Sequence, residues 1–201
     1  MQGSIVAFQN EILVYNMNLM MLPRLQEQYR KNVVPALQKQ FGIKNVMAVP
    51  KIKKVTVNTG IGRMLKDNKA VEKAERDLAL LAGQKPVFRK AKKSISSFKV
   101  RQGMPVGLSV TIRGKRMYDF LDRLISIALP MSKDFRGIEL KNIDAHGNLN
   151  LGVREHNIFP EVTYETLKDI FGLQVTVTTN AKNREQGIEL FRQLGFPIKK
   201  S

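Results

Sequence analysis

Polar and apolar residues alternate in four stretches of the chain, which is the pattern of half-buried β-strands. These stretches are 54–59, 106–112, 148–154 and 174–180. Phe98 and Val100 alternate in the same way with Lys99 and Arg101, just before the turn residues QGMP. We therefore predict a β-hairpin whose second strand is 106–112, with a basic tip within 89–93.

Apolar residues recur at helical spacing in five other stretches. We predict helices at about 22–40, 68–82, 118–129, 163–171 and 184–194. Pro35 is expected to kink or split the first helix, and Pro130 to end the third. The order α-β-α-β-β-α-β-α-β-α is typical of an α+β fold with an antiparallel or mixed sheet. We expect a split-βαβ-like arrangement, with the helices packed on one face of the sheet and a basic β-hairpin protruding from it.

The predicted strands carry short, neutral, hydrogen-bonding side chains opposite their apolar faces. These side chains are Thr56, Asn58, Ser109, Thr111, Asn150, Thr176 and Thr178. A solvated sheet face more often carries long lysine and glutamate side chains, so this face is expected to be flat and open to a partner. The alternative is that threonine is simply a good strand former.

Charge is distributed very unevenly along the sequence. The net charge is +17, yet residues 119–201 hold 11 basic and 11 acidic residues. The whole excess therefore lies in residues 1–118, which contain two acid-free windows, 28–66 and 78–118. Short charge runs are usually solvated faces, but windows of this length favour an anionic partner such as a nucleic acid.

Residues that carry catalysis or bind metals are scarce. There is no cysteine, and the two histidines, His146 and His156, are expected to be ordinary loop residues. The sequence also lacks the nucleophile-elbow, zinc-protease and complete phosphate-loop motifs. An enzyme acting through Asp119 and Asp122 is a rival hypothesis, but their spacing beside Arg123 favours a solvated helix face with local ion pairs. We therefore expect no catalytic residue, no metal site and no cofactor.

Several strings of the sequence resemble one known family when they are taken together and in order. They are VTVNTGIG, LALLAGQKPVFRKAKKSISSFKVRQGMPVG, VTIRGKRMYDFLDRLI, DFRGI, GNLNLGVREHNIFPE and LGFPIKK. From about residue 21 to residue 200 the chain resembles bacterial-type ribosomal protein five of the large subunit, the 5S rRNA-binding family. The resemblance implies a single non-enzymatic domain at 21–201. Residues 1–20 have no counterpart in the family and form an N-terminal extension to which nothing transfers.

The resemblance implies that the sheet and nearby loops bind 5S rRNA and attach it to 23S rRNA in the central protuberance. In the family, the residues that correspond to Asn58, Gln84 and Thr111 contact 5S rRNA, and two of these three lie on the polar face described above. We expect the same RNA-binding surface to include further residues: Thr56, Tyr29, Lys54, Arg63 and Arg113.

The resemblance also implies two contacts outside the 5S rRNA surface. The family's basic hairpin loop, here about 88–98, reaches toward P-site tRNA, and its expected tRNA-facing residues are Arg89, Lys90, Lys92 and Lys93. Arg89 stands where threonine is usual, and Ser97 where glycine is frequent. A protein bridge to the small-subunit head is expected to use Asp134, Arg136, Asp144 and Arg154.

The remaining expectations concern location and other partners. Neighbouring large-subunit proteins are expected partners, whereas a membrane is not, because no apolar run approaches the roughly 20 residues of a membrane span. The expected location is the ribosome, in the cytoplasm or in a plastid. A generic nucleic-acid binder outside the ribosome is the remaining alternative, and it would not prefer 5S rRNA over a competitor RNA.

Overall fold

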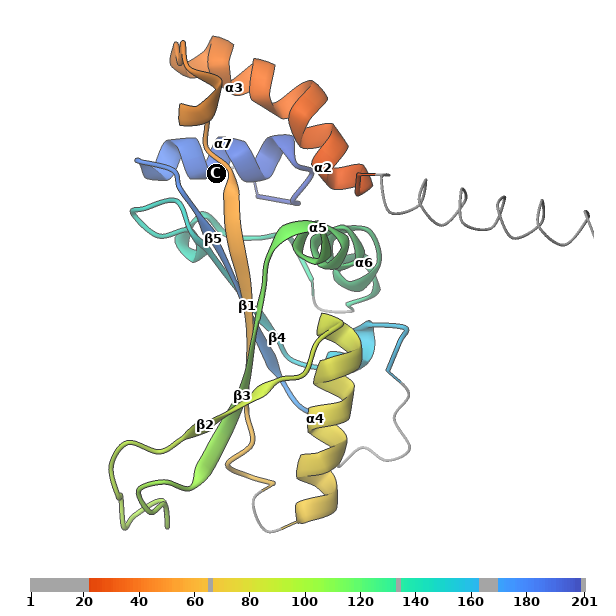
Figure 1. The fold of residues 1–201 in the computed structure, drawn as a ribbon, viewed down its shortest axis with the longest axis vertical. Helices are drawn as coiled ribbons and strands as arrows, with labels where there is room; N and C mark the ends of the chain where they lie inside the picture. Colours follow the sequence, from red (N-terminus) through yellow and green to blue (C-terminus); the bar gives the residue numbers. More distant parts are fainter. Residues whose placement is uncertain (1–21, 65–66, 133–134, 163–169, 200–201) are drawn as a thin grey trace, which may run out of the picture.

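The computed structural model describes residues 22–64, 67–132, 135–162 and 170–199. Within these residues, five strands form one antiparallel sheet in the order β2-β3-β1-β5-β4 (Figure 1). The strands are β1 Ile52–Gly60, β2 Val87–Lys90, β3 Pro105–Ile112, β4 Leu149–Val153 and β5 Leu173–Thr179. The predicted α+β fold is confirmed, and the sheet is antiparallel throughout the described strands. The proposed extension at 1–20 and most of the helix predicted at 163–171 lie outside the described residues.

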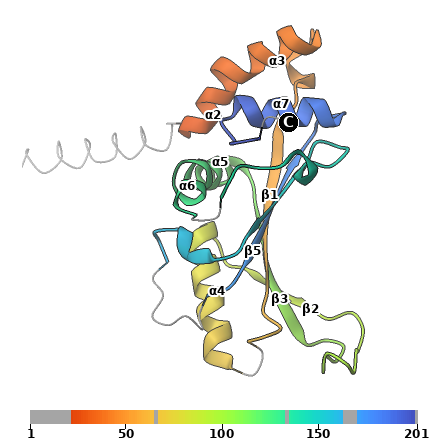
Figure 2. The ribbon, with the colours of Figure 1, turned by 180° about the vertical axis from the view of Figure 1, so that it is seen from behind.

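The longer helices pack on one face of the sheet or at one end of it. They are α2 Arg24–Gln28, α3 Val34–Phe41, α4 Asn68–Ala82, α5 Gly114–Arg123, α6 Leu129–Met131 and α7 Arg184–Gln193. Figures 1 and 2 show α4, α5 and α6 along the same face, α3 and α7 at one end of the molecule, and the β2–β3 hairpin at the other. Short 3₁₀ turns occupy Val46–Ala48, Leu140–Asn142 and His156–Ile158.

The sheet residues that alternate in the sequence also alternate in burial. In β1, Val55 and Val57 are buried, whereas Asn58 is exposed. The same alternation of buried and exposed residues runs through β4 and β5. Together with apolar residues of α4, α5 and α7, the buried face forms one hydrophobic core. The polar face of the sheet is therefore turned away from α4, α5 and α6.

Both prolines predicted to disturb helices follow a widened π turn. Tyr29–Val33 precedes Pro35, and Leu124–Ala128 precedes Pro130. In each case the residue before the proline donates its N–H to the carbonyl five positions back. The wider turn leaves room for the proline ring, which would otherwise clash with a helical carbonyl. Pro35 thus interrupts the first helix as predicted, but the prediction that Pro130 ends the third helix is wrong, because that helix continues to Met131.

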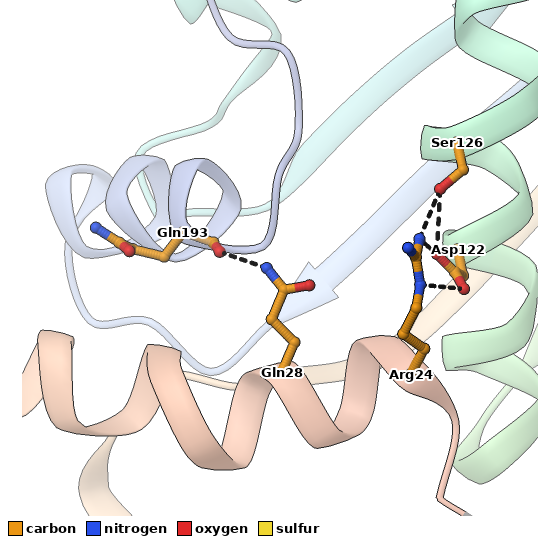
Figure 3. Close-up of polar contacts among 5 residues, drawn as sticks. All are labelled: Arg24, Gln28, Asp122, Ser126 and Gln193. Atoms are coloured by element: carbon orange, nitrogen blue, oxygen red, sulfur yellow. Dashed lines mark hydrogen bonds and ion pairs between the residues drawn. The ribbon is translucent and has the colours of Figure 1, made fainter.

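Figure 3 shows how the first helical segment is fastened to two other helices. The Arg24 guanidinium donates to the Asp122 carboxylate on α5 and to the Ser126 hydroxyl at 2.9 Å. The Gln28 side chain donates to the carbonyl of Gln193, the last residue of α7, at 3.2 Å. The local pairing expected for Asp122 is therefore wrong, because its partner lies 98 positions away in the sequence.

His156 is a core residue, which the sequence did not predict. Its side chain is 0% exposed, and its ring stacks on Phe171 with centroids 3.9 Å apart. Its Nδ1 accepts a hydrogen bond from the Phe171 N–H at 3.3 Å, while Nε2 lies 3.5 Å from an Asp77 carboxylate oxygen on α4. Burial lowers the pKa of His156, against the opposing effect of Asp77. The imidazole thus links Phe171 to Asp77 of α4 within the core.

Candidate nucleic-acid interface

The polar face of the sheet carries a row of four hydrogen-bonding side chains that crosses four strands. In the strand register, Thr111 of β3 is opposite Thr56 of β1, Thr56 is opposite Thr176 of β5, and Thr176 is opposite Asn150 of β4. The Thr176 hydroxyl donates to the Asn150 side-chain oxygen at 2.8 Å. All four side chains are at least partly exposed. The row presents hydroxyl and amide groups at a spacing that the sheet itself fixes.

A second row lies beside the first, and it is less uniform. It runs from Ser109 through Asn58 and Gln174 to Gly152. Asn58 is exposed, but Ser109 is only 6% exposed. The expectation that Ser109 is part of the accessible face is therefore wrong, whereas Asn58 stands free at the surface.

Gln84 is brought to the same patch by the end of α4. Asp67 caps the start of this helix, accepting from the Lys69 N–H at 3.0 Å, and Gly83 ends it in the left-handed conformation with φ 66°. The chain then turns back, and the Gln84 amide donates to the Thr111 carbonyl at 2.9 Å. Two residues that are 27 positions apart in the sequence are thus directly joined at β3, whose Thr111 is opposite Thr56 of β1.

The basic residues expected near this patch lie around its margins. Lys54 shares the polar face of β1 with Thr56 and is opposite Thr178. Arg113 directly follows the last residue of β3, and Arg63 lies just after the last residue of β1. Because the two strands are antiparallel, these residues lie at opposite ends of the sheet, and both are exposed. The cations therefore flank the neutral rows without interrupting them.

Tyr29 is the expected RNA contact that the structure places elsewhere. It belongs to the first π turn, half-buried, and its hydroxyl donates to the Pro50 carbonyl at 3.0 Å. Burial, and then the neighbouring Tyr118, raises the pKa of Tyr29 to about 12, so the phenol is neutral at any physiological pH. The geometry gives it an anchoring role at the start of β1.

The basic hairpin differs in detail from its prediction. Arg89 and Lys90 lie within β2, opposite Gly107 and Pro105 of β3, so they belong to the arm of the hairpin. Its tip is the loop of residues 91–104, which we call the arm loop. The predicted tip at 89–93 is therefore wrong for Arg89 and Lys90, whereas 91–93 do lie in the arm loop. The strand predicted at Phe98–Val100 is wrong as well.

The arm loop adds residues that the sequence reading did not select. Besides the expected Lys92 and Lys93, Lys99 and Arg101 are exposed there, and so is Phe98. None of the four cations forms an ion pair with a described residue. The acid-free window at 78–118 could have identified the two additional cations, since the whole arm loop lies within it.

The expected bridge residues do not form one cluster of free charges. Asp134 lies outside the described residues, while Arg136 and Arg154 are exposed. Asp144 closes its own loop, accepting from the backbone N–H groups of His146 at 2.9 Å and Asn148 at 2.8 Å and from the Asn148 side chain. Burial opposes ionisation of Asp144, but these hydrogen bonds outweigh it and lower the pKa of the carboxyl. The Asp144 carboxylate is thus hydrogen-bonded within its own loop.

The described residues lack two features. They contain no cluster of three or more metal-ligating side chains. Their helices are also too short or too polar to cross a membrane.

Comparison with known proteins gives consistent matches over most of the chain. A family model described as ribosomal protein L5 matches residues 45–101, and a model of the C-terminus of the same ribosomal family matches residues 105–198. The large ribosomal subunit proteins uL5 of Cupriavidus metallidurans and Chloroflexus aurantiacus are each 50% identical to this chain over 179 residues. These matches cover 89% of this chain and 99% of each relative. The protein of the same name from Colwellia psychrerythraea is 48% identical over the same length. The chain therefore belongs to the bacterial-type uL5 family of large-subunit ribosomal proteins.

Proposed function

We propose that this structural, non-enzymatic constituent of the large ribosomal subunit binds 5S rRNA through the polar face of its sheet and attaches it to 23S rRNA in the central protuberance. The observation that carries the proposal is the row Thr111–Thr56–Thr176–Asn150, with Asn58 and Gln84 beside it. Membership of the family supports a place on cytoplasmic ribosomes. The expected single domain at 21–201 belongs to the same proposal.

The shape of this face suits RNA. Short side chains allow a nucleic-acid backbone to approach the strands closely, and hydroxyl and amide groups can both donate to and accept from ribose 2′-hydroxyls and base edges. Gly60 follows Asn58 on the polar side of β1, with open space where a Cβ would stand. The face therefore reads RNA by hydrogen bonds at fixed positions and by shape.

Charge supplies the part of the affinity that does not depend on sequence. Lys54, Arg63 and Arg113 flank the polar rows and can each neutralise a phosphate. Each such contact releases counterions and makes log K fall with log salt by about 0.7 to 0.9. Hydrogen bonds of the rows should change affinity without changing that slope.

The proposal is tested by filter binding of the full chain to 5S rRNA over a series of salt concentrations. Asn58→Ala and Thr111→Val should each weaken binding by about two- to tenfold, because a net hydrogen bond contributes about 0.5–1.5 kcal/mol. Thr111→Val keeps the shape and strand propensity of the residue, so it isolates the hydroxyl. Thr176→Val on β5 shows whether RNA covers the whole row. Wild-type affinity in all of these variants would refute the assignment.

Two further contacts belong to the proposal. We infer that the arm loop, with Arg89 and Lys90 behind it, contacts P-site tRNA. The loop ends a protruding hairpin (Figure 2), and its exposed cations have no acidic partner among the described residues. We infer that residues 134–154 contact a protein of the small-subunit head, since residues 119–201 have a zero charge balance. Among the described bridge candidates, Arg136 and Arg154 are the exposed ones.

A further inference from the structure

The tip of the arm loop has a defined backbone. Ile95 and Val100 exchange two backbone hydrogen bonds of 2.9 and 3.1 Å, and the Lys99 N–H donates to the Ser96 carbonyl at 3.0 Å. Lys99 has a φ of 54° and is the one non-glycine residue with positive φ among the described residues. A left-handed lysine is an uncommon conformation, and these bonds hold it in place. Residues 96–99 thus form a tight turn within the larger hairpin.

This turn presents Phe98 to the outside. The Phe98 side chain is 75% exposed, and among the described residues it forms no ring-to-ring contact. By contrast, Phe120, Phe159 and Phe191 are almost completely buried. Leaving a phenyl ring in water forgoes the free energy that burial would provide. Fold stability therefore gives no reason for an aromatic ring at the tip.

Four cations share the arm loop with this ring. Lys92, Lys93, Lys99 and Arg101 are exposed, and none is ion-paired with a described residue. The sequence from 78 to 118 contains no acidic residue. An apolar ring amid unpaired positive charge fits a partner that offers both a flat apolar surface and negative charge. RNA offers both, as base planes and phosphates.

We propose that Phe98 is a stacking platform for an exposed base plane of tRNA, while the cations of the arm loop contact its phosphates. The proposal rests on the proposed tRNA contact of the arm loop and names the chemistry of that contact. Stacking tolerates any base, because every base has a π-face. A loop that meets successive tRNAs can therefore hold each of them without reading its sequence. Figure 1 places this loop at the end of the molecule opposite α3 and α7, where no other described helix or strand covers it.

The test compares variants of Phe98 in ribosomes that carry the full chain, with tRNA dissociation from the P site measured over a series of salt concentrations. Phe98→Ala and Phe98→Leu should speed dissociation about tenfold with an unchanged salt slope, since stacking is lost and charge is kept. Phe98→Trp should keep or slow the wild-type rate. The matched control is Phe88→Ala, which removes the partly exposed aromatic side chain at the base of the same hairpin. It should leave the rate unchanged.

A second measurement uses the isolated chain, which contains no tryptophan. The indole of Phe98→Trp is then its only one, and stacking on tRNA should quench its emission. If Lys92→Gln with Lys93→Gln speeds dissociation but Phe98→Ala does not, the stacking inference falls and the tRNA contact stands. If neither variant changes the rate, the tRNA contact falls as well. If Phe98→Leu behaves as wild type, the tip binds a generic apolar surface such as a protein, and stacking is refuted.

Discussion

The polar face of the sheet and the arm loop are both proposed RNA contacts, yet they differ in every physical property that the structure displays. The face is built mainly from neutral side chains, whose spacing is set by strand register. The arm loop protrudes, carries four exposed cations and shows an aromatic ring. A ligand that stays bound for the lifetime of a particle can be held by many positioned hydrogen bonds. One that is exchanged repeatedly is better held by charge and stacking, which tolerate variation in sequence.

Among the changes that test this comparison, removing the charge of the arm loop should have the largest effect, which is on tRNA dissociation. In a variant with Lys92, Lys93, Lys99 and Arg101 all changed to glutamine, we expect P-site tRNA to dissociate on the order of a hundredfold faster at low salt. The salt slope should fall by about 3, because up to four phosphate contacts are lost. Tight 5S rRNA binding should remain in a filter assay. Loss of 5S rRNA with normal tRNA retention would reverse the roles given to the two regions.

A methyl group on the polar face should have the next largest effect. A Cβ at Gly60 meets no atom within 4 Å, and its φ is not in the left-handed region. Gly60→Ala should therefore leave the isolated protein unchanged or more stable by about 0.4–1 kcal/mol. It should nevertheless weaken 5S rRNA binding by up to about tenfold, because the methyl group holds the RNA away from Asn58.

Calorimetry of the free protein and filter binding measure the two sides of this prediction. Gly152→Ala is the matched comparison at the other end of the second row, since it adds a methyl group in equally open space on the edge strand β4. Weakened binding from Gly152→Ala alone would move the RNA footprint toward β4 and away from β1.

The charge-neutral part of the chain should respond differently from both RNA contacts. Arg136→Glu should weaken association of the two ribosomal subunits a few-fold, with 5S rRNA and tRNA binding retained, because it reverses an exposed charge on the proposed bridge. Lys182→Glu reverses another exposed charge of the same neutral part and serves as the control. Sucrose-gradient profiles at lowered magnesium measure association. Impaired RNA binding with normal association would contradict the division between the two parts.

Mild acid should have the smallest effect among these changes. It should lower the stability of the fold and weaken 5S rRNA binding by the sheet, but it should not change tRNA binding by the arm loop. Burial lowers the pKa of His156 in the folded state, with Asp77 raising it and Lys73 adding to the decrease. The unfolded chain therefore binds a proton below about pH 6.5 that the folded chain excludes, so stability is full above that pH and decreases as the pH falls below it. Asp77 lies on α4, which leads into Gln84. We therefore expect 5S rRNA binding to weaken as the stability of the fold decreases at low pH.

Thermal unfolding at about pH 7.5 and about pH 5.5, on either side of the ordinary histidine pKa, checks the sign of this effect. In His156→Gln, which keeps a hydrogen-bond acceptor near the Phe171 N–H, the decrease between the two pH values should be smaller. The effect of arm-loop charge on tRNA dissociation should be the same at both values. An equal decrease in wild type and variant would assign the acid sensitivity to other groups.

The strands that could be predicted are those with one buried and one exposed face. Val55 and Val57 give β1 a period of two, and the polar positions between them already outline the candidate surface. β2 could not be found in this way, because all four of its residues are exposed and burial imposes no alternation on them. For the same reason the sequence pattern placed the hairpin tip at 89–93, whereas the arm loop spans 91–104.

The polar contacts between distant segments were also beyond prediction from the sequence. Nothing in the local pattern indicates that Gln84 donates to the Thr111 carbonyl or that Arg24 pairs with Asp122. His156 lies in a polar string, REHNIF, and only the packing of Phe171 and α4 around it makes it a core residue. The alternation of buried and exposed side chains along one strand is local information, whereas such contacts depend on the assembled fold.

The strand order also determines the order in which parts of the sheet can form while the chain is being synthesised. β1 lies between β3 and β5, so one of its edges is completed by residues up to 112 and the other only by residues 173–179. At a synthesis rate of roughly 5–20 residues per second, the intervening stretch takes about 3 to 13 s to emerge. During that interval Val55 and Val57 stand at an open strand edge, a template for pairing with another chain. The side-chain row that crosses four strands is complete only when β5 has formed, so the sheet surface cannot exist until residues up to 179 have been synthesised.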